Sequence, residues 1–135
     1  GAGAMLFRYE NGGFEVLIGK RSLKRGYKKW AIPGGGMNRD DKGYEDCAYR
    51  ELKEETGLDL LSIEKHWGTS LSAVGFSNEK NTCIVGTAGG RISRSVFDTE
   101  EIEAGWYTKD EVKTLLENNI FAARTQAYCY IWCES

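Results

Sequence analysis

Three glutamates stand close together in the segment RELKEETGL, which runs from Arg50 to Leu58. Glu51, Glu54 and Glu55 are spaced i, i+3 and i+4, so a helix would project their carboxylates from one face. Like charges at this spacing destabilise an isolated helix by about 0.2 to 0.5 kcal/mol per pair. A hard divalent cation such as Mg²⁺ or Mn²⁺ takes oxygen ligands and would turn this repulsion into binding. The spacing therefore indicates a metal site, against the alternative of a solvated acidic helix face.

Two neighbouring features favour the metal site over the solvated face. A glycine-rich run, PGGG at residues 33–36, shortly precedes the acidic segment. Glycine lets the backbone approach a ligand closely or turn with positive φ. Arg50 directly adjoins Glu51 and could orient the carboxylates. This combination is much less common than three clustered glutamates alone.

The pattern around these residues resembles the signature of the Nudix hydrolases, G-x5-E-x7-R-E-U-x-E-E-x-G-U, in which U is a bulky aliphatic residue. Gly36 and the run from Arg50 to Leu58 match its fixed positions in register. The one departure is Lys42, which stands where the family has its first glutamate. The flanking segments LIGKR (17–21), WAIPGG (30–35) and EAGWYTKDEV (103–112) also look like the family, so the resemblance spans about residues 2 to 118.

The resemblance implies a metal-dependent pyrophosphohydrolase that cleaves a nucleoside diphosphate linked to another moiety, such as a nucleotide or a sugar. Metal ions held by carboxylates can screen the charge of a pyrophosphate, orient it and acidify the attacking water. By the family pattern, Glu51, Glu54 and Glu55 bind Mg²⁺ or Mn²⁺ together with the backbone carbonyl of Gly35. Glu51, Glu54 and Arg50 are the expected catalytic residues.

The general base stays open at this point, because family members differ in which acid takes that part. One of the three glutamates, or an acid in a later loop, would position or deprotonate the water. The later candidates are Glu100, Glu101 and Glu103.

Lys42 raises a second question, because a lysine there would face Arg50 as a like charge instead of a partner. Asp40, Asp41 and Glu45 are close enough in the chain to substitute for the missing glutamate. If none does, the alternative is a Nudix-fold nucleotide-binding or sensor module with weak or lost catalysis. The intact cluster of glutamates favours the enzyme, since a pure binder needs no three adjoining carboxylates.

Substrate contacts are expected from residues outside the acidic segment. Arg21 ends a predicted strand next to the site and is the expected phosphate contact. Trp30 and Phe76 could stack on a base, with packing in the core as the alternative for both. The basic run from Lys20 to Lys29 either guides a polyanion or keeps a loop solvated. His66 is expected to be a partly buried structural side chain.

Composition limits the classes of protein to which this chain can belong. The 135 residues are 41% hydrophobic and 12% aromatic with one proline, which is typical of one compact globular domain, and we expect a single domain over 1–135. A formal net charge of −2 argues against nucleic acid and membrane surfaces as partners and leaves a small-molecule nucleoside diphosphate. The chain has no apolar run of spanning length and no signal-peptide pattern, so we expect a cytoplasmic protein. The four cysteines form no CxxC pair and are expected to be free, buried thiols.

Strands and helices interleave along the chain. Turn residues ENGG between two alternating runs predict a hairpin over residues 4–22, and 82–88 and 91–97 read as two further strands. Tyr44 to Thr56 is a predicted helix ended by Gly57. T-K-D-E at 108–111 has the form of a capping box that opens a helix through about Asn118, and Ala122 to Trp132 is a predicted last helix. The expected fold class is α/β, a Nudix-type α/β/α sandwich with a central mixed sheet. A homodimer is possible through the aromatic segment Tyr128 to Trp132, which could equally close the core.

Overall fold

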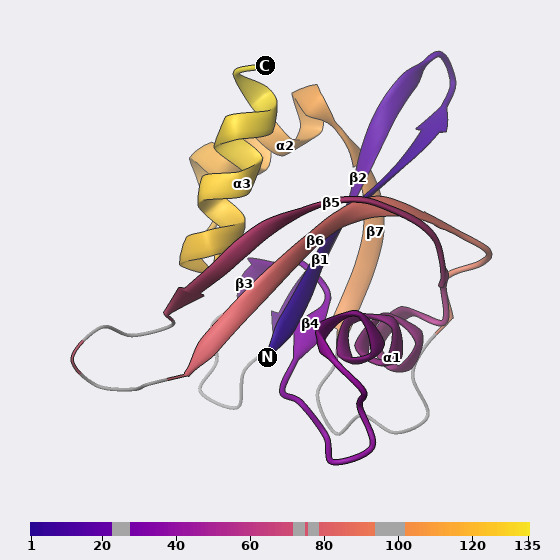
Figure 1. Cartoon of the computed structure of the whole chain (residues 1–135). Coiled ribbons are helices and arrows are strands. Elements are labelled where there is room, and N and C mark those ends of the chain that lie inside the picture. The colour runs from indigo at the N-terminus through magenta and orange to yellow at the C-terminus, as the bar shows by residue number, and fades with distance from the viewer. Residues whose placement is uncertain (23–27, 72–74, 76–78, 94–101) are drawn as a thin grey trace.

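A mixed β-sheet with helices on both of its faces forms the framework of the molecule (Figure 1). The structure is a computed structural model that describes residues 1–22, 28–71, 75, 79–93 and 102–135. Its strands are β1 (Ala2–Glu10), β2 (Gly13–Ser22), β3 (Lys28–Ala31), β4 (Gly34–Gly35), β5 (Asp59–Leu71), β6 (Lys80–Gly89) and β7 (Ile102–Thr108). Its helices are α1 (Tyr44–Thr56), α2 (Lys109–Asn118) and α3 (Ala123–Cys133). The predicted α/β class with a mixed sheet is confirmed.

The sheet has the order β3-β2-β1-β6-β5, with β4 paired to β1 and β7 paired to β2. β1 runs parallel to β6, while its pairings with β2 and β4 are antiparallel. The β1–β2 hairpin closes through Asn11 and Gly12, whose φ angles are 51° and 82°. Positive φ at both loop residues suits the twist of a two-residue hairpin. The hairpin prediction is therefore confirmed.

Both faces of the sheet are buried, as the alternation of side chains along β2 shows. Val16 and Ile18 belong to a core cluster shared with α2 and α3. Leu17 points into a second cluster, shared with α1. Because successive residues of a strand face opposite sides, one apolar run can serve two cores. In Figure 1, α1 accordingly lies on one side of the sheet and α2 and α3 on the other.

The helices begin and end as the sequence predicts. Thr108 accepts a hydrogen bond from the backbone of Glu111 at 3.2 Å and donates its own N–H to the Glu111 carboxylate at 2.9 Å, a complete capping box. α1 ends at Gly57, which has a φ of 77° and donates its N–H to the carbonyl of Lys53 at 2.9 Å. None of the helices in the described ranges is long and apolar enough to span a membrane.

The C-terminal aromatic segment contributes to the core and to the surface. Trp132 packs edge-on against Phe7, and Tyr128 lies against Trp67. Ile131, by contrast, is 60% exposed. Core closure is thus seen directly, while the homodimer stays a prediction.

Some expectations differ from the structure. The predicted strand 82–88 lies within β6, whereas residues 91–93 of the predicted strand 91–97 are not part of a strand and 94–97 lie outside the described residues. β6 pairs instead with β5, a long strand whose mixed pattern gives no clear period in the sequence. His66 on β5 is exposed, not partly buried, and contacts Glu45. The four cysteines are free and buried, as predicted.

The end of α1 depends on a residue without a side chain, which a paired substitution can show. A Cβ at Gly57 would collide with the hydroxyl of Ser93, whereas a Cβ at Gly12, also at positive φ, meets nothing within 4 Å. We expect Gly12→Ala to lower the free energy of unfolding by about 1 to 2 kcal/mol, the cost of a left-handed residue. Gly57→Ala should lower it by more. Urea unfolding of both variants measures the difference, and equal losses would contradict the role of Ser93.

Candidate active site

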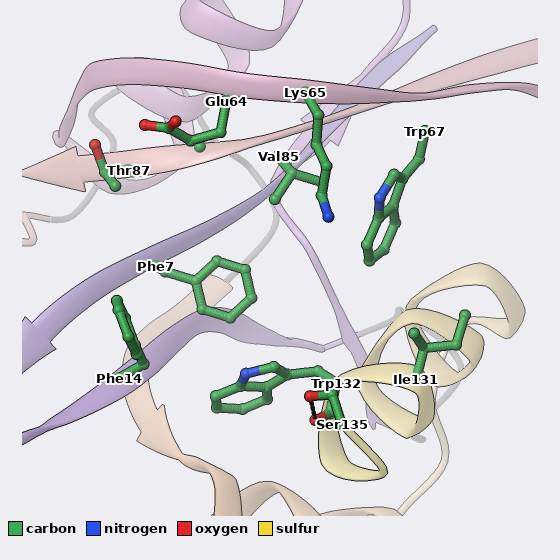
Figure 2. A pocket seen from close by; sticks show the side chains of 11 residues that line it. Phe7, Phe14, Glu64, Lys65, Trp67, Val85, Thr87, Ile131, Trp132 and Ser135 are labelled. Carbon is green, nitrogen blue, oxygen red and sulfur yellow. Dashed lines mark hydrogen bonds between the residues drawn. The ribbon is translucent and has the colours of Figure 1, made fainter.

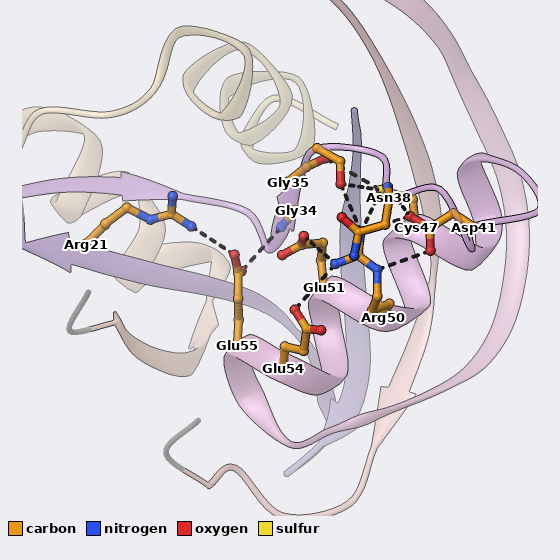
Figure 3. Close-up of polar contacts among 11 residues, drawn as sticks. Arg21, Gly34, Gly35, Asn38, Asp41, Cys47, Arg50, Glu51, Glu54 and Glu55 are labelled. Carbon is orange, nitrogen blue, oxygen red and sulfur yellow. Dashed lines mark hydrogen bonds and ion pairs between the residues drawn. The ribbon is translucent and has the colours of Figure 1, made fainter. Parts of the chain in front are cut away.

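Arg50 lies at the centre of a cluster of carboxylates on the face of α1 that meets the glycine loop, residues 33–36 (Figure 3). Its Nη1 donates to Glu51 Oε1 at 2.8 Å and to Glu54 Oε2 at 3.4 Å. Its Nη2 donates to the carbonyl oxygen of Gly36 at 2.9 Å. One guanidinium therefore neutralises two of the clustered glutamates and ties the helix to the glycine loop.

Asp41 supplies the carboxylate that Lys42 does not. Its Oδ1 and Oδ2 accept from Nε and Nη2 of Arg50 at 3.1 and 2.8 Å, a two-point contact. Lys42 is exposed, and so is Asp40. Glu45, the third candidate substitute, lies 3.1 Å from Nε2 of His66 instead. Of the three acids that could replace the missing glutamate, the structure thus selects Asp41.

The third glutamate of the cluster, Glu55, faces a different partner. It is 9% exposed, and its Oε1 accepts from Nη2 of Arg21 at 2.9 Å. Its Oε2 accepts from the backbone N–H of Gly34 at 3.3 Å. Arg21 comes from the end of β2, as predicted, so this contact connects the sheet, the glycine loop and α1.

The glycine loop approaches the helix so closely that a side chain at Gly35 would displace the carboxylate of Glu51. A Cβ at Gly35 would lie 2.5 Å from Cδ of Glu51 and 2.6 Å from its Oε1. The carbonyl of Gly35 accepts a weak hydrogen bond from the buried thiol of Cys47, at 3.5 Å. Gly35 therefore lies next to the acidic helix, as predicted, and its backbone is close to the Glu51 carboxylate.

The electrostatics of the cluster follow from these contacts. The hydrogen bond from Arg50 lowers the pKa of Asp41 below its ordinary value, and the backbone N–H of Asn38 lowers it further. The hydrogen bond to Asp41, and to a smaller extent the one to Glu51, raises the pKa of Arg50, although burial lowers it. Burial raises the pKa of the Cys47 thiol. Asp41 and Arg50 therefore form a charged pair over the whole range of ordinary pH.

Other expected site residues are placed differently. Trp30 is 6% exposed and packs in the core, edge-on to Tyr107 and stacked near Phe121, which is the packing alternative named above. Glu103 lies on β7 and is exposed. Phe76, Glu100, Glu101 and part of the basic run lie outside the described residues.

A cavity of about 400 Å³ lies at the β1–β2 hairpin and the start of α2, and its described lining includes no residue of α1. Two further cavities offer room for a ligand. One, of about 290 Å³, is lined by the glycine loop, Arg21 and the first residues of α3. The other, of about 520 Å³, is lined by aromatic side chains such as Phe7, Trp67 and Trp132 (Figure 2). The described lining of the larger cavity includes no residue of α1. The described lining of the smaller cavity includes no residue of α1 either, but it holds Arg21 and Gly34, which contact Glu55, and Gly35, which lies against Glu51. The smaller cavity is therefore the candidate substrate site.

The donor set of the cluster suits a hard divalent cation. Glu51, Glu54 and Glu55, with the carbonyl of Gly35, offer only oxygen ligands, which Mg²⁺ and Mn²⁺ prefer. Within the described residues, no three acidic, histidine or cysteine side chains already form a cage for a metal ion. Their oxygens contact arginines instead. The chemistry of the donors fits, and the arginines hold the carboxylates close together.

Sequence reasoning could not single out Asp41, because Asp40, Asp41 and Glu45 are equally near along the chain. It also gave no weight to Arg124, which lines the smaller cavity from α3. No local pattern marks that residue, since the cavity forms only when α3 packs beside the glycine loop.

The Asp41–Arg50 pair predicts a pH dependence of stability. The pKa of Asp41 is depressed in the folded state, so its contribution is present above its unfolded pKa of about 3.9 and is lost as pH falls through the folded value. Asp41→Asn should therefore lower the free energy of unfolding near neutral pH, and its difference from the wild type should shrink in acid. Urea unfolding across this range measures it. Asp40→Asn is the control, and an equal, pH-independent loss in both variants would contradict the pairing.

Comparison with known proteins places this geometry in a family. The sequence model of the NUDIX domain matches residues 1–129. An RNA pyrophosphohydrolase of Haemophilus influenzae is 43% identical over 58 residues, 39% of this chain and 28% of that protein's length. The segment shared with that relative is thus less than a third of its length.

Solved structures with the same fold extend the likeness over the whole chain. A MutT structure, described for Aliivibrio salmonicida and Vibrio cholerae, has a TM-score of 0.71 and 18% identity, covering 98% of this chain and 94% of that one. The NUDIX domain of Shewanella oneidensis NrtR, complexed with ADP ribose, has a TM-score of 0.66 and 20% identity, covering 93% and 80%. At these identities the likeness concerns the fold. Since the family's sequence model matches nearly all of the chain, and the glutamate helix, its arginine and the glycine loop meet in the structure, the protein belongs to the NUDIX domain family.

Proposed function

We propose that this protein is a metal-dependent pyrophosphohydrolase that cleaves a nucleoside diphosphate linked to another group. The observation that carries the proposal is that Arg50 contacts Glu51, Glu54 and the carbonyl of Gly36, while Glu55 accepts from the N–H of Gly34 in the same glycine loop. A relative named RNA pyrophosphohydrolase is 43% identical over 58 residues, and a NUDIX domain of similar fold has been solved with ADP ribose. These names support a substrate that contains a diphosphate.

The reaction adds water across a phosphoric anhydride. A bond forms between the water oxygen and one phosphorus, the bridging P–O bond breaks, and the proton lost by water leaves with a base or product. Mg²⁺ or Mn²⁺, when bound, would neutralise phosphate charge and lower the pKa of a bound water. Glu51, Glu54, Glu55 and the Gly35 carbonyl would hold the ion.

The remaining residues position these groups. Arg50 keeps Glu51 and Glu54 together, and Asp41 fixes the orientation of Arg50 by its two-point contact. Arg21 lines the cavity beside Glu55 and would bind a phosphate oxygen. Glu54 is the most exposed of the three carboxylates, at 43% of its side chain. We therefore assign it the task of holding or deprotonating the water, which requires an accessible carboxylate.

The alternative of a binding or sensor module drew its support from Lys42. Because Asp41 contacts Arg50, the arginine is paired and the carboxylates are held in place although residue 42 is a lysine. The enzyme is therefore the function that this geometry supports best.

Metal-dependent turnover tests the proposal. A panel of nucleoside diphosphate derivatives is incubated with Mg²⁺ or Mn²⁺, and phosphatase-coupled phosphate release reports only cleaved product. Glu54→Gln and Glu51→Gln should each lower kcat/KM by about 100-fold or more, because they remove a carboxylate that holds metal or water. Glu45→Gln, on the exposed first turn of the same helix, should retain activity. Turnover that survives chelation of the metal, or equal rates in all variants, would overturn the proposal.

Lys42→Glu tests the place of Asp41 in the site. Because Arg50 already has a carboxylate partner, restoring the family's glutamate should change kcat/KM by less than about threefold, the scale of an exposed charge pair. In the background of Asp41→Asn the same substitution should recover part of the lost activity. A large gain from Lys42→Glu alone would show that Asp41 does not replace the glutamate.

A further inference from the structure

Arg124 carries a polar atom that the fold does not satisfy. In the described part of the chain, its Nη1 is the one buried side-chain nitrogen or oxygen that has no hydrogen-bond partner. No described acid forms an ion pair with this guanidinium. Buried donors are nearly always satisfied, and an exception calls for a reason such as a missing ligand. The unpaired donor is therefore a feature to be explained by function.

The place of Arg124 connects it to the candidate substrate site. It is the second residue of α3, and its side chain lines the smaller cavity together with the glycine loop and Arg21. A Cβ at Gly3 would lie 2.8 Å from its Nη2, so the absence of a side chain on β1 makes room for the guanidinium. Gly3 in turn pairs with Gly34, whose N–H contacts Glu55. Arg124 thus lies across the glycine loop from the carboxylates.

The wall around Arg124 favours a ligand with acceptor atoms. α3 begins after Ala122 without a side-chain cap, and the positive end of the helix faces the cavity. Thr125, the other polar residue of this turn, is already engaged, since its hydroxyl accepts from the N–H of Ile32 at 3.1 Å. The donors left for a ligand at this end are those of Arg124 and the first backbone amides of the helix.

The same wall also holds groups that a site for a bare anion would exclude. Ala31, Ile32 and Ala122 give it apolar surface, and Glu79 places a carboxylate on the lining. A carboxylate repels a second phosphate but can accept hydrogen bonds from a neutral ring. Flat apolar surface with donors and an acceptor at the edge matches a nucleobase.

We propose that Arg124 determines base specificity and selects a 6-oxopurine such as guanine over adenine in the substrate. The O6 and N7 atoms of guanine are adjacent acceptors that match the two-pronged donor geometry of a guanidinium. Adenine carries an amino group in place of O6, which would set donor against donor. This inference depends on the proposed function, because it takes the smaller cavity as the nucleotide site.

Matched nucleotides that differ only in the base give the test. GTP is compared with ATP, and GDP-glucose with ADP-glucose, for the wild type and for Arg124→Met and Arg124→Gln. Arg124→Met removes the donors at similar length, while Arg124→Gln offers the amide that pairs with N6 and N7 of adenine. Arg91→Met, an exposed arginine at the end of β6, is the matched control.

The expected result is a change of preference and not a uniform loss. The wild type should favour guanine by about 10-fold or more in kcat/KM, as a good two-point contact allows. Arg124→Met should remove this preference by slowing the guanine substrate, and Arg124→Gln should shift it toward adenine. Arg91→Met should match the wild type. Equal losses for both bases in Arg124→Met would overturn the inference and identify a phosphate contact instead.

Equilibrium binding separates this inference from the proposed hydrolysis. Calorimetric titration with GDP and ADP measures base preference without turnover. If the wild type binds GDP more tightly but cleaves nothing, the base contact stands and the hydrolase does not. If it cleaves both bases equally and binds both equally, the hydrolase stands and this inference fails. Thermal unfolding of Arg124→Met tests for a structural effect of the substitution. Because the substitution removes an unsatisfied donor, the midpoint temperature of unfolding should stay unchanged or rise. A clear fall in that temperature would contradict an unsatisfied donor.

Discussion

The structure of the site depends on keeping several carboxylates close together. Glu51 and Glu54 on one helix face repel each other, and Arg50 offsets that repulsion by contacting both. Asp41 holds the same guanidinium through Nε and Nη2, and this contact raises the pKa of Arg50. The charge pairs are partly buried, so they are screened less by salt than pairs on an open surface. The acidic face is thereby arranged before any metal or substrate arrives.

A second constraint joins this helix to the sheet. Glu55 contacts Arg21 from β2 and the N–H of Gly34, so one buried carboxylate bridges three elements. Losing either partner would remove part of the compensation of a buried charge, which is unfavourable. The close approach of Gly35 to Glu51 adds a steric condition to the electrostatic one. The glycine loop, the arginine and the glutamates therefore form one unit, which a single sequence signature encodes.

The two cavities differ in the kinds of groups that line them. The larger one is bordered by aromatic side chains and lies away from the described charges of α1. The smaller one combines backbone, cations and a carboxylate at the place where α3 meets the glycine loop. Size alone would select the aromatic cavity, whereas the proposed chemistry needs convergent polar groups. Arg124 shows how the last helix, far away in sequence, can contribute to a site that the first half of the chain builds.

The sequence by itself determined the hairpin, the extent of α1, its glycine end and the capping box at Thr108, because these depend on contacts within a few residues. It also determined the family and the set of glutamates, since their spacing is local. Tertiary structure alone decided that Asp41 replaces the glutamate missing at Lys42, that Trp30 packs in the core, and that β6 pairs with β5. It alone brought Arg124 to the cavity. These outcomes depend on which distant segments meet, and competing partners at similar distances along the chain are distinguished only by packing.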